Sequence, residues 1–185
     1  MSPEEINSLA ETLKIISDIT ESQPDPWLPI YAALGGAIAG AIASFFPTWL
    51  IEKHRERTFS KQIENCLLAE ISSLMEIIDQ RNYLSAIEEA VHYLRNEPEG
   101  TTYSLVVDVP PHYSRVYQEN CKNIGVVKNE IARDIVIFHQ LIDAVVQDLK
   151  PNGIFSSGTK LETFEEMEKI FNQALTIGHE LIKNT

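Results

Sequence analysis

The sequence has few of the residues on which several common chemistries depend. It contains only two cysteines, Cys66 and Cys121, which lie far apart and lack the spacing of a metal site. Its 15 lysines and arginines against 27 aspartates and glutamates leave a net charge of -12. That balance argues against a nucleic-acid partner, which requires a basic surface. The sequence also has no glycine-rich phosphate loop, no CxxC pair and no HExxH motif.

Long apolar runs are scarce too, and only one is long enough to cross a membrane. Residues 27–51 carry no charged side chain over 25 positions. A helix rises ~1.5 Å per residue, so a hydrocarbon core ~30 Å thick requires about 20 apolar residues. We therefore expect a transmembrane helix at 27–51, in a single-pass protein whose first partner is the lipid bilayer.

A signal peptide and a buried soluble helix are the less favoured identities for this segment. A signal peptide begins with basic residues and has a short apolar core. Residues 1–26 instead carry six acidic side chains and one base, Lys14. A buried helix of a soluble protein is the second alternative. We expect a retained anchor.

The charges that flank the apolar segment predict its direction, because lysine and arginine near a span are retained in the cytoplasm. Basic residues follow the segment at Lys53, Arg55, Arg57 and Lys61. We expect the inner (plasma) membrane, with residues 1–26 outside and residues 52–185 forming a cytoplasmic helical domain. Side chains suited to the membrane interfaces are Trp27, Tyr31, Trp49, Lys53, Arg55 and Arg57.

Small residues recur every four positions along one face of the predicted span. They are Ala32, Gly36, Gly40 and Ser44. In lipid, close approach and dispersion contacts drive helices together, and small residues permit that approach. We expect this face to assemble a homo-oligomer, with Ser44 adding an interhelical hydrogen bond. The alternative is that glycine and alanine are simply common in spans.

Before the span, the sequence predicts a short amphipathic helix. Ser2 and Glu5 have the pattern of a capping box. The apolar stripe that follows is Ile6, Leu9, Ala10, Leu13, Ile16 and Thr20. This arm either packs on a partner or on another copy of the chain, or remains a marginal helix on a solvated tail.

After the span, residues 52–95 contain no glycine or proline and predict a long helix that continues from it. Its apolar stripe is Phe59, Ile63, Leu67, Ile71, Leu74, Ile78, Leu84, Ile87, Val91 and Leu94. The polar run at residues 79–82 interrupts the stripe and predicts a bend. A bundle is favoured over a coiled coil because further apolar residues widen the stripe.

Residues 101–109 alternate between apolar and polar side chains, which is typical of a strand. The sequence shows no convincing partner strand. We expect an extended segment that either lies over the helices or pairs with the same segment of another copy.

Three further helices complete the mainly α fold. A short helix ends at Gly125, the most apolar helix covers residues 128–149, and a capping box at Thr159 and Glu162 opens the last. The inward residues expected on the two long helices are Ile131, Ile135, Phe138, Ile142, Val145, Leu149, Phe164, Met167, Phe171, Leu175, Gly178 and Ile182.

No set of residues predicts catalysis, a cofactor or a metal centre. Glu89 and His92 have the spacing of half a di-iron site, but such a site requires a second motif and two more carboxylates. His139 and Asp143 lie one turn apart and are a candidate acid–base pair. The favoured interpretation is a satisfied, partly buried histidine near a carboxylate.

Polar residues also gather around the turn before residue 128. His112 beside Tyr113, and Asn120 near Asn123, are candidates for a small polar pocket. Their alternative role is helix capping and turn formation. Ser156 and Ser157 lack the context of a nucleophile elbow.

The pattern of one span, a basic exit and a helical tail resembles a group of uncharacterised bacterial single-span membrane proteins. The residues that carry this resemblance are Tyr117, Asn120, Asn123, Ile124, Gly125, Ile135, Val136, Phe138, His139 and Leu141. The resemblance covers about the last two thirds of the chain. It implies a bacterial inner-membrane setting and no particular activity.

Two functions from different classes fit the sequence. The first is a membrane-anchored, self-associating module whose helical domain recruits or senses an unknown cytoplasmic protein. The second is a membrane-perturbing effector whose spans assemble under control of the helical domain. The near absence of polar residues in 27–51 weighs against a water-filled pore. An enzyme has no supporting set of residues.

Overall fold

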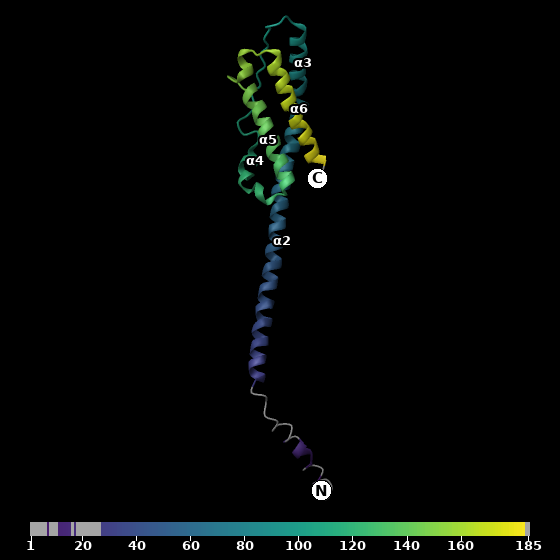
Figure 1. Cartoon of the computed structure of the whole chain (residues 1–185), viewed down its shortest axis with the longest axis vertical. Coiled ribbons are helices and arrows are strands. Elements are labelled where there is room, and N and C mark those ends of the chain that lie inside the picture. The colour runs from purple at the N-terminus through teal and green to yellow at the C-terminus, as the bar shows by residue number, and fades with distance from the viewer. Residues whose placement is uncertain (1–6, 8–10, 16, 18–26, 184–185) are drawn as a thin grey trace. The chain divides into compact units, whose positions relative to one another are not determined.

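The computed structural model describes residues 7, 11–15, 17 and 27–183. Over these residues the structure is mainly helical and contains no strand, so the predicted fold class is confirmed (Figure 1). The chain divides into two compact units, Met1–His54 and Arg55–Thr185. The second unit is called the helical domain below.

The elements follow one another in a simple order. The α-helices are α2 (Leu28–Gln80), α3 (Tyr83–Asn96), α4 (Arg115–Asn120), α5 (Asn129–Leu149) and α6 (Leu161–Lys183). Two 3-10 helices, η1 (Cys121–Val126) and η2 (Ile154–Ser157), join them. The short helix predicted to end at Gly125 is thus split, because α4 gives way to η1 at Cys121.

One helix, α2, contains both the apolar segment and the first core helix of the helical domain. Pro29 lies in its first turn, where a missing N–H costs little. The helix also continues through Pro47. It ends at Gln80, because Asn82 adopts the left-handed conformation that asparagine tolerates better than most residues. The bend predicted at 79–82 is therefore a break. Figure 1 shows α3 lying beyond the end of α2 rather than folding back along it.

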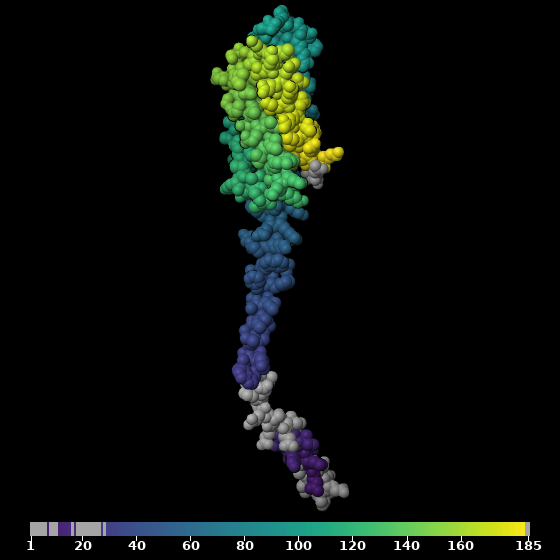
Figure 2. Space-filling model, viewed as in Figure 1, coloured from purple at the N-terminus to yellow at the C-terminus, as the bar shows by residue number. Residues whose placement is uncertain are grey.

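The core of the helical domain lies among α2, α3, α5 and α6. Most residues of the predicted stripes are buried, among them Leu67, Ile71, Ile87, Ile135, Phe138 and Phe164. Phe59 is exposed, at 42% of its surface, and the half-buried members are Ile78, Leu84, Ile131, Leu175 and Ile182. Helix α6 packs against both α5 and α3, and Figure 2 shows α5 and α6 side by side on the surface. Helical periodicity thus predicted the core faces, because one stripe of each helix must leave water.

Residues 101–109 form an extended arm over the helices and not a strand. Their only bridge is Tyr103 with Thr159, within the part of the chain that the structure describes. Two more backbone N–H groups bond to carbonyls at helix ends, from Leu105 to Phe155 and from Val107 to Leu149. Leu105 and Val107 pack against the core, as the alternation predicted. Helix ends supply the hydrogen-bond acceptors that a neighbouring strand would otherwise provide.

The same bridge overturns the capping box predicted at Thr159. Helix α6 begins at Leu161, and the Lys160 carbonyl accepts the first helical hydrogen bond, from the N–H of Phe164. Thr159 is held by Tyr103 instead, and its hydroxyl is buried without a partner. Pairing with a distant segment therefore outweighed the local capping pattern.

Gly178 lies where α6 closely approaches side chains of α2 and α5. A Cβ at this position would lie 2.7 Å from Met75 Sδ on α2 and 2.9 Å from Phe138 Cε2 on α5. We expect Gly178→Ala to lower the free energy of unfolding by about 1–2 kcal/mol, because overpacking outweighs the gain in helix propensity. Urea unfolding of the full chain in detergent measures this. Gly125→Ala is the control, since nothing lies within 4 Å of its Cβ position. Equal stability of the two variants would show that the core can expand at Gly178.

Most of the predicted N-terminal helix lies outside the described residues. This holds for Ser2, Glu5 and every residue of its apolar stripe except Leu13. Residues 11–15 are helical, and Leu13 is exposed.

Candidate functional site

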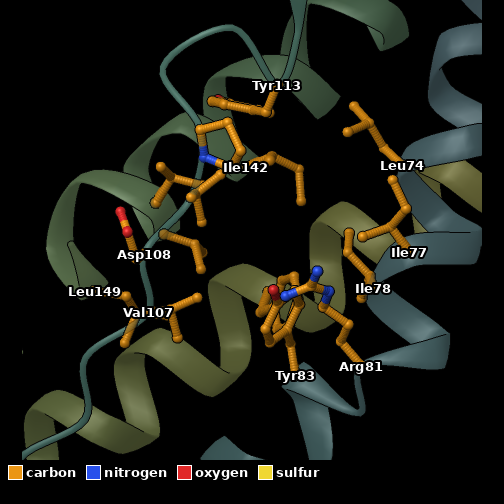
Figure 3. Close-up of a pocket in the computed structure, with 15 residues that line it drawn as sticks. Leu74, Ile77, Ile78, Arg81, Tyr83, Val107, Asp108, Tyr113, Ile142 and Leu149 are labelled. Carbon is orange, nitrogen blue, oxygen red and sulfur yellow. The ribbon is translucent and has the colours of Figure 1, made fainter.

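The helical domain contains an apolar pocket at the end of α2. Its volume is about 330 Å³, and its walls come from α2, the start of α3, the extended arm, α5 and α6 (Figure 3). Eleven lining side chains are apolar: Leu74, Ile77, Ile78, Val107, Val109, Pro110, Ile142, Val145, Val146, Leu149 and Phe171. The remaining four are Arg81, Tyr83, Asp108 and Tyr113. Small-molecule sites commonly combine apolar walls with a few polar groups in this way.

Tyr113 closes one side of the pocket as a neutral hydrogen-bond donor. Its hydroxyl donates to Asp143 Oδ1 on α5 at 3.1 Å. Burial raises the pKa of the Tyr113 phenol above its usual range, and the negative charge of Asp143 raises it further. Tyr113 therefore keeps its proton at neutral pH and cannot serve as a base there.

Arg81 contributes a positive charge at the opposite side. Figure 3 shows its guanidinium group pointing toward the cavity, while the Asp108 carboxylate points away from it. Among the residues that the structure describes, no carboxylate forms an ion pair with Arg81. The pocket thus combines an apolar interior with one unpaired cation at its edge.

A buried polar cluster lies elsewhere in the same domain and joins α2, α4 and α5. The Glu70 carboxylate accepts hydrogen bonds from the backbone N–H groups of Val116 at 2.7 Å and Tyr117 at 2.8 Å. These are first-turn donors of α4, whose own N-cap residue, Ser114, makes no side-chain cap. Glu70 therefore caps α4 from a different helix.

His139 lies next to this carboxylate and is almost fully buried. Its ring stacks on Tyr117 with the centroids 4.0 Å apart, and its Nε2 atom lies 3.8 Å from Glu70 Oε2. Neither ring nitrogen has a hydrogen-bond partner. Burial lowers the pKa of His139 to about 4, so the ring is neutral at pH 7.

These contacts rule out the candidate acid–base pair of His139 and Asp143, which was the less favoured interpretation. Asp143 accepts the Tyr113 hydroxyl, whereas the carboxylate beside His139 is Glu70. The histidine is more buried than the favoured interpretation assumed, and it is not satisfied by hydrogen bonds. The two residues are one turn apart in sequence, but only His139 faces the core.

The small-residue face lies open along α2. No heavy atom lies within 4 Å of the Cβ positions of Gly36 and Gly40. Ala32 and Ser44 are exposed as well. The Ser44 hydroxyl donates to the Gly40 carbonyl of its own helix at 2.8 Å, so its proton is already used. The interhelical hydrogen bond predicted for Ser44 would require that donor to turn away, or the oxygen to act as acceptor.

The predicted interface residues are exposed at the two ends of the apolar segment. Trp27 and Tyr31 lie at one end and Trp49 at the other. The Lys53 ammonium group lies 4.8 Å from the centroid of the Trp49 ring, within range of a cation–π contact. Arg55 and Arg57 are exposed on the next turn.

The other candidate residues are exposed or make local hydrogen bonds. Glu89 and His92 are exposed on α3. The Asn120 side chain donates a hydrogen bond to the Val116 carbonyl at the end of α4, as expected for a capping residue. His112 is exposed. Ser156 donates to the Gly153 carbonyl within a turn.

Two residues of the pocket and the polar cluster, Arg81 and Glu70, were not predicted from the sequence. Glu70 could have been noticed as an acid directly beside Ile71 on an otherwise apolar stripe, because a charge there requires a buried partner. Arg81 lies in a polar run, where a charged residue is ordinary and indicates no buried partner. Its place at the pocket depends on walls that come from segments far apart in the sequence.

No protein-family model, curated protein or solved structure matches this chain. Its function is therefore inferred from its own residues.

Proposed function

We propose that this chain is a single-pass membrane protein with a cytoplasmic, non-catalytic helical domain that recruits or senses a partner. The observation that carries the proposal is the exposure of the apolar part of α2. In the described chain, α2 is the one helix long and apolar enough to span a membrane, and no residue of its most apolar stretch is buried. An apolar surface of that length requires lipid or protein to cover it.

The proposed orientation is supported by the side chains after the apolar segment. Lys53, Arg55, Arg57 and Lys61 follow it, and all four are exposed. Lys53 lies over Trp49, which combines an aromatic ring and a cation where a membrane interface would be. We infer a bacterial inner-membrane protein with its N-terminus outside.

Self-association through the span is the second part of the proposal. The open face of Ala32, Gly36, Gly40 and Ser44 allows another helix to approach the backbone closely. The hydroxyls of Ser44 and Thr48 both donate to carbonyls of their own helix. The face is therefore suited to packing and poorly suited to lining water, which argues against the effector alternative.

We expect Gly36→Ile combined with Gly40→Ile to dissociate the oligomer, because two branched side chains would hold the helices apart. Crosslinking in native membranes, followed by denaturing electrophoresis, measures the effect. The matched control is Ala37→Ile with Ala41→Ile, which places the same side chains about 100° further round the helix.

Three results would count against parts of this proposal. If the glycine variant stays oligomeric, the span is not the interface. If the glycine variant and the alanine control both dissociate, added side-chain bulk anywhere on the helix disrupts the oligomer, and the small-residue face is not its specific interface. If expression of the unmodified protein depolarises cells and expression of the glycine variant does not, the protein is a membrane-perturbing effector and not an interaction module. Partners recovered in the same crosslinks would identify the cytoplasmic protein.

A further inference from the structure

We propose that the apolar pocket of the helical domain binds a single-chain carboxylate amphiphile, such as a medium-length fatty acid, with its carboxylate on Arg81. This inference names a ligand for the sensing module and so rests on the function proposed above. It is carried by the size of the pocket, the chemistry of its walls and the position of its charges.

The size and walls of the pocket fit one short hydrocarbon chain. At roughly 30 Å³ per small group, a volume of about 330 Å³ holds on the order of ten non-hydrogen atoms. The lining offers apolar side chains from four separate segments, represented by Leu74, Val107, Val145 and Phe171. Each methylene group moved from water into such walls gains about 0.8 kcal/mol.

The charge at the edge of the pocket selects an anion. Arg81 lines the cavity and is exposed, and no carboxylate of the described chain pairs with it. Arg81 is the one lysine or arginine among the residues that line this cavity, so it alone can supply a positive charge there. A guanidinium group matches a carboxylate with two parallel hydrogen bonds. The hydroxyl of Tyr83, which also lines the cavity, is a further donor at this edge.

The opposite side of the pocket sets the direction of the ligand. Figure 3 shows Tyr113 across the cavity from Arg81, and its hydroxyl is already bonded to Asp143. The negative charge of Asp143 would repel a ligand carboxylate at that side. The hydrocarbon tail is therefore directed toward Tyr113, and the head group remains at Arg81 near solvent.

A photocrosslinking experiment on the full chain tests this inference. The protein is placed in nanodiscs of phosphatidylcholine and exposed to a diazirine analogue of decanoate, and the labelled residues are mapped by mass spectrometry. Unlabelled decanoate and uncharged decanol serve as competitors. The variants are Arg81→Gln, which removes the charge, and Ile77→Trp, which fills the pocket from a half-exposed position. The control is Arg133→Gln on the outer surface of α5, where Arg133 pairs with Asp134.

We expect labels on the walls of the pocket, with decanoate competing about tenfold better than decanol. Arg81→Gln should lower pocket labelling about tenfold, as expected for loss of a charged hydrogen-bonded pair. Ile77→Trp should abolish it, and Arg133→Gln should leave it unchanged. Labels confined to residues 27–51 would overturn the inference, because they show partition into the bilayer alone.

Two further outcomes would also overturn it. Pocket labelling that is unaffected by Arg81→Gln would mean that Arg81 does not bind the carboxylate of the probe. Competition by decanol as strong as that by decanoate would mean that the pocket selects the hydrocarbon chain and not the carboxylate. The photolabelling experiment reports the position of the ligand and not the oligomeric state. A negative result here can therefore be told apart from a failure of the glycine variant to dissociate, which would count against the proposed function.

Discussion

Glu70→Ala is expected to lower the free energy of unfolding of the helical domain by about 3 kcal/mol. The substitution leaves the N–H groups of Val116 and Tyr117 without acceptors in a partly buried site. Each buried donor left unpaired costs about 1–3 kcal/mol. Two such donors outweigh any gain from removing a carboxylate whose side chain is only 8% exposed.

Urea unfolding of the full chain in detergent, followed by circular dichroism, measures this effect. Glu70→Gln should lose about half as much, because its single amide oxygen can still accept one of the two bonds. Glu76→Ala is the matched control on the exposed side of α2, where only a local contact with Gln80 is lost. If Glu70→Ala and Glu76→Ala cost the same, the capping of α4 by Glu70 contributes nothing measurable.

The second large effect concerns acid stability. His139 has a pKa of about 4 in the folded protein, against 6.5 for an ordinary histidine. Between these values the unfolded chain binds a proton that the folded protein does not, so stability rises with pH. Stability is therefore lost as pH falls from 6.5 toward about 4. At about 1.36 kcal/mol per pKa unit the loss approaches 3 kcal/mol.

His139→Phe should remove most of this acid slope. Phenylalanine keeps the stack on Tyr117 but cannot be protonated and has no unpaired ring nitrogens. Urea unfolding at a series of pH values compares the two proteins, so that titration of other groups cancels. Attraction between a protonated His139 and Glu70, 3.8 Å away, opposes the loss, which makes about 3 kcal/mol an upper bound. An unchanged slope in the variant would assign the acid sensitivity to other residues.

The helices were predictable because their signals are local. In α5 and α6, apolar residues at helical spacing predicted the buried faces, from Ile135 through Leu149 and from Phe164 through Gly178. At the end of α6, Leu181 is buried in place of the predicted Ile182, which is half-buried. A period of 3.6 residues places these side chains on one side of the helix, whichever element packs against that side. The break near Asn82 was placed correctly for the same reason, although it was predicted as a bend.

The sequence was least decisive where a distant segment decides the local structure. Residues 101–109 were predicted as an extended segment that lies over the helices or pairs with another copy, and the first alternative is confirmed, because helix ends and Thr159 supply their hydrogen bonds. Thr159 has the spacing of a cap, but its backbone is held by Tyr103. The pairing of His139 with Asp143 followed from spacing along α5, whereas burial selected Glu70 from α2.

The candidate site depended still more on the tertiary structure. Arg81 is separated from Tyr113 and Asp143 in the sequence, and its place at the pocket edge follows from how α2, the arm and α5 meet. Nothing in the sequence around Arg81 distinguishes it from the other exposed bases. A pocket is formed by several segments together, so the spacing of residues along any one helix cannot predict it.

The sequence by itself determined the helical fold class, the core faces and the one apolar segment long enough to span a membrane. Each depends on composition and spacing along a single helix, where chain geometry alone decides the outcome. The tertiary structure alone decided the cap that Glu70 supplies to α4, the burial of His139 without hydrogen bonds to its ring nitrogens, and the pocket with its unpaired Arg81. These features arise from contacts between segments far apart in the chain, and only packing selects such contacts from the many that the residues allow.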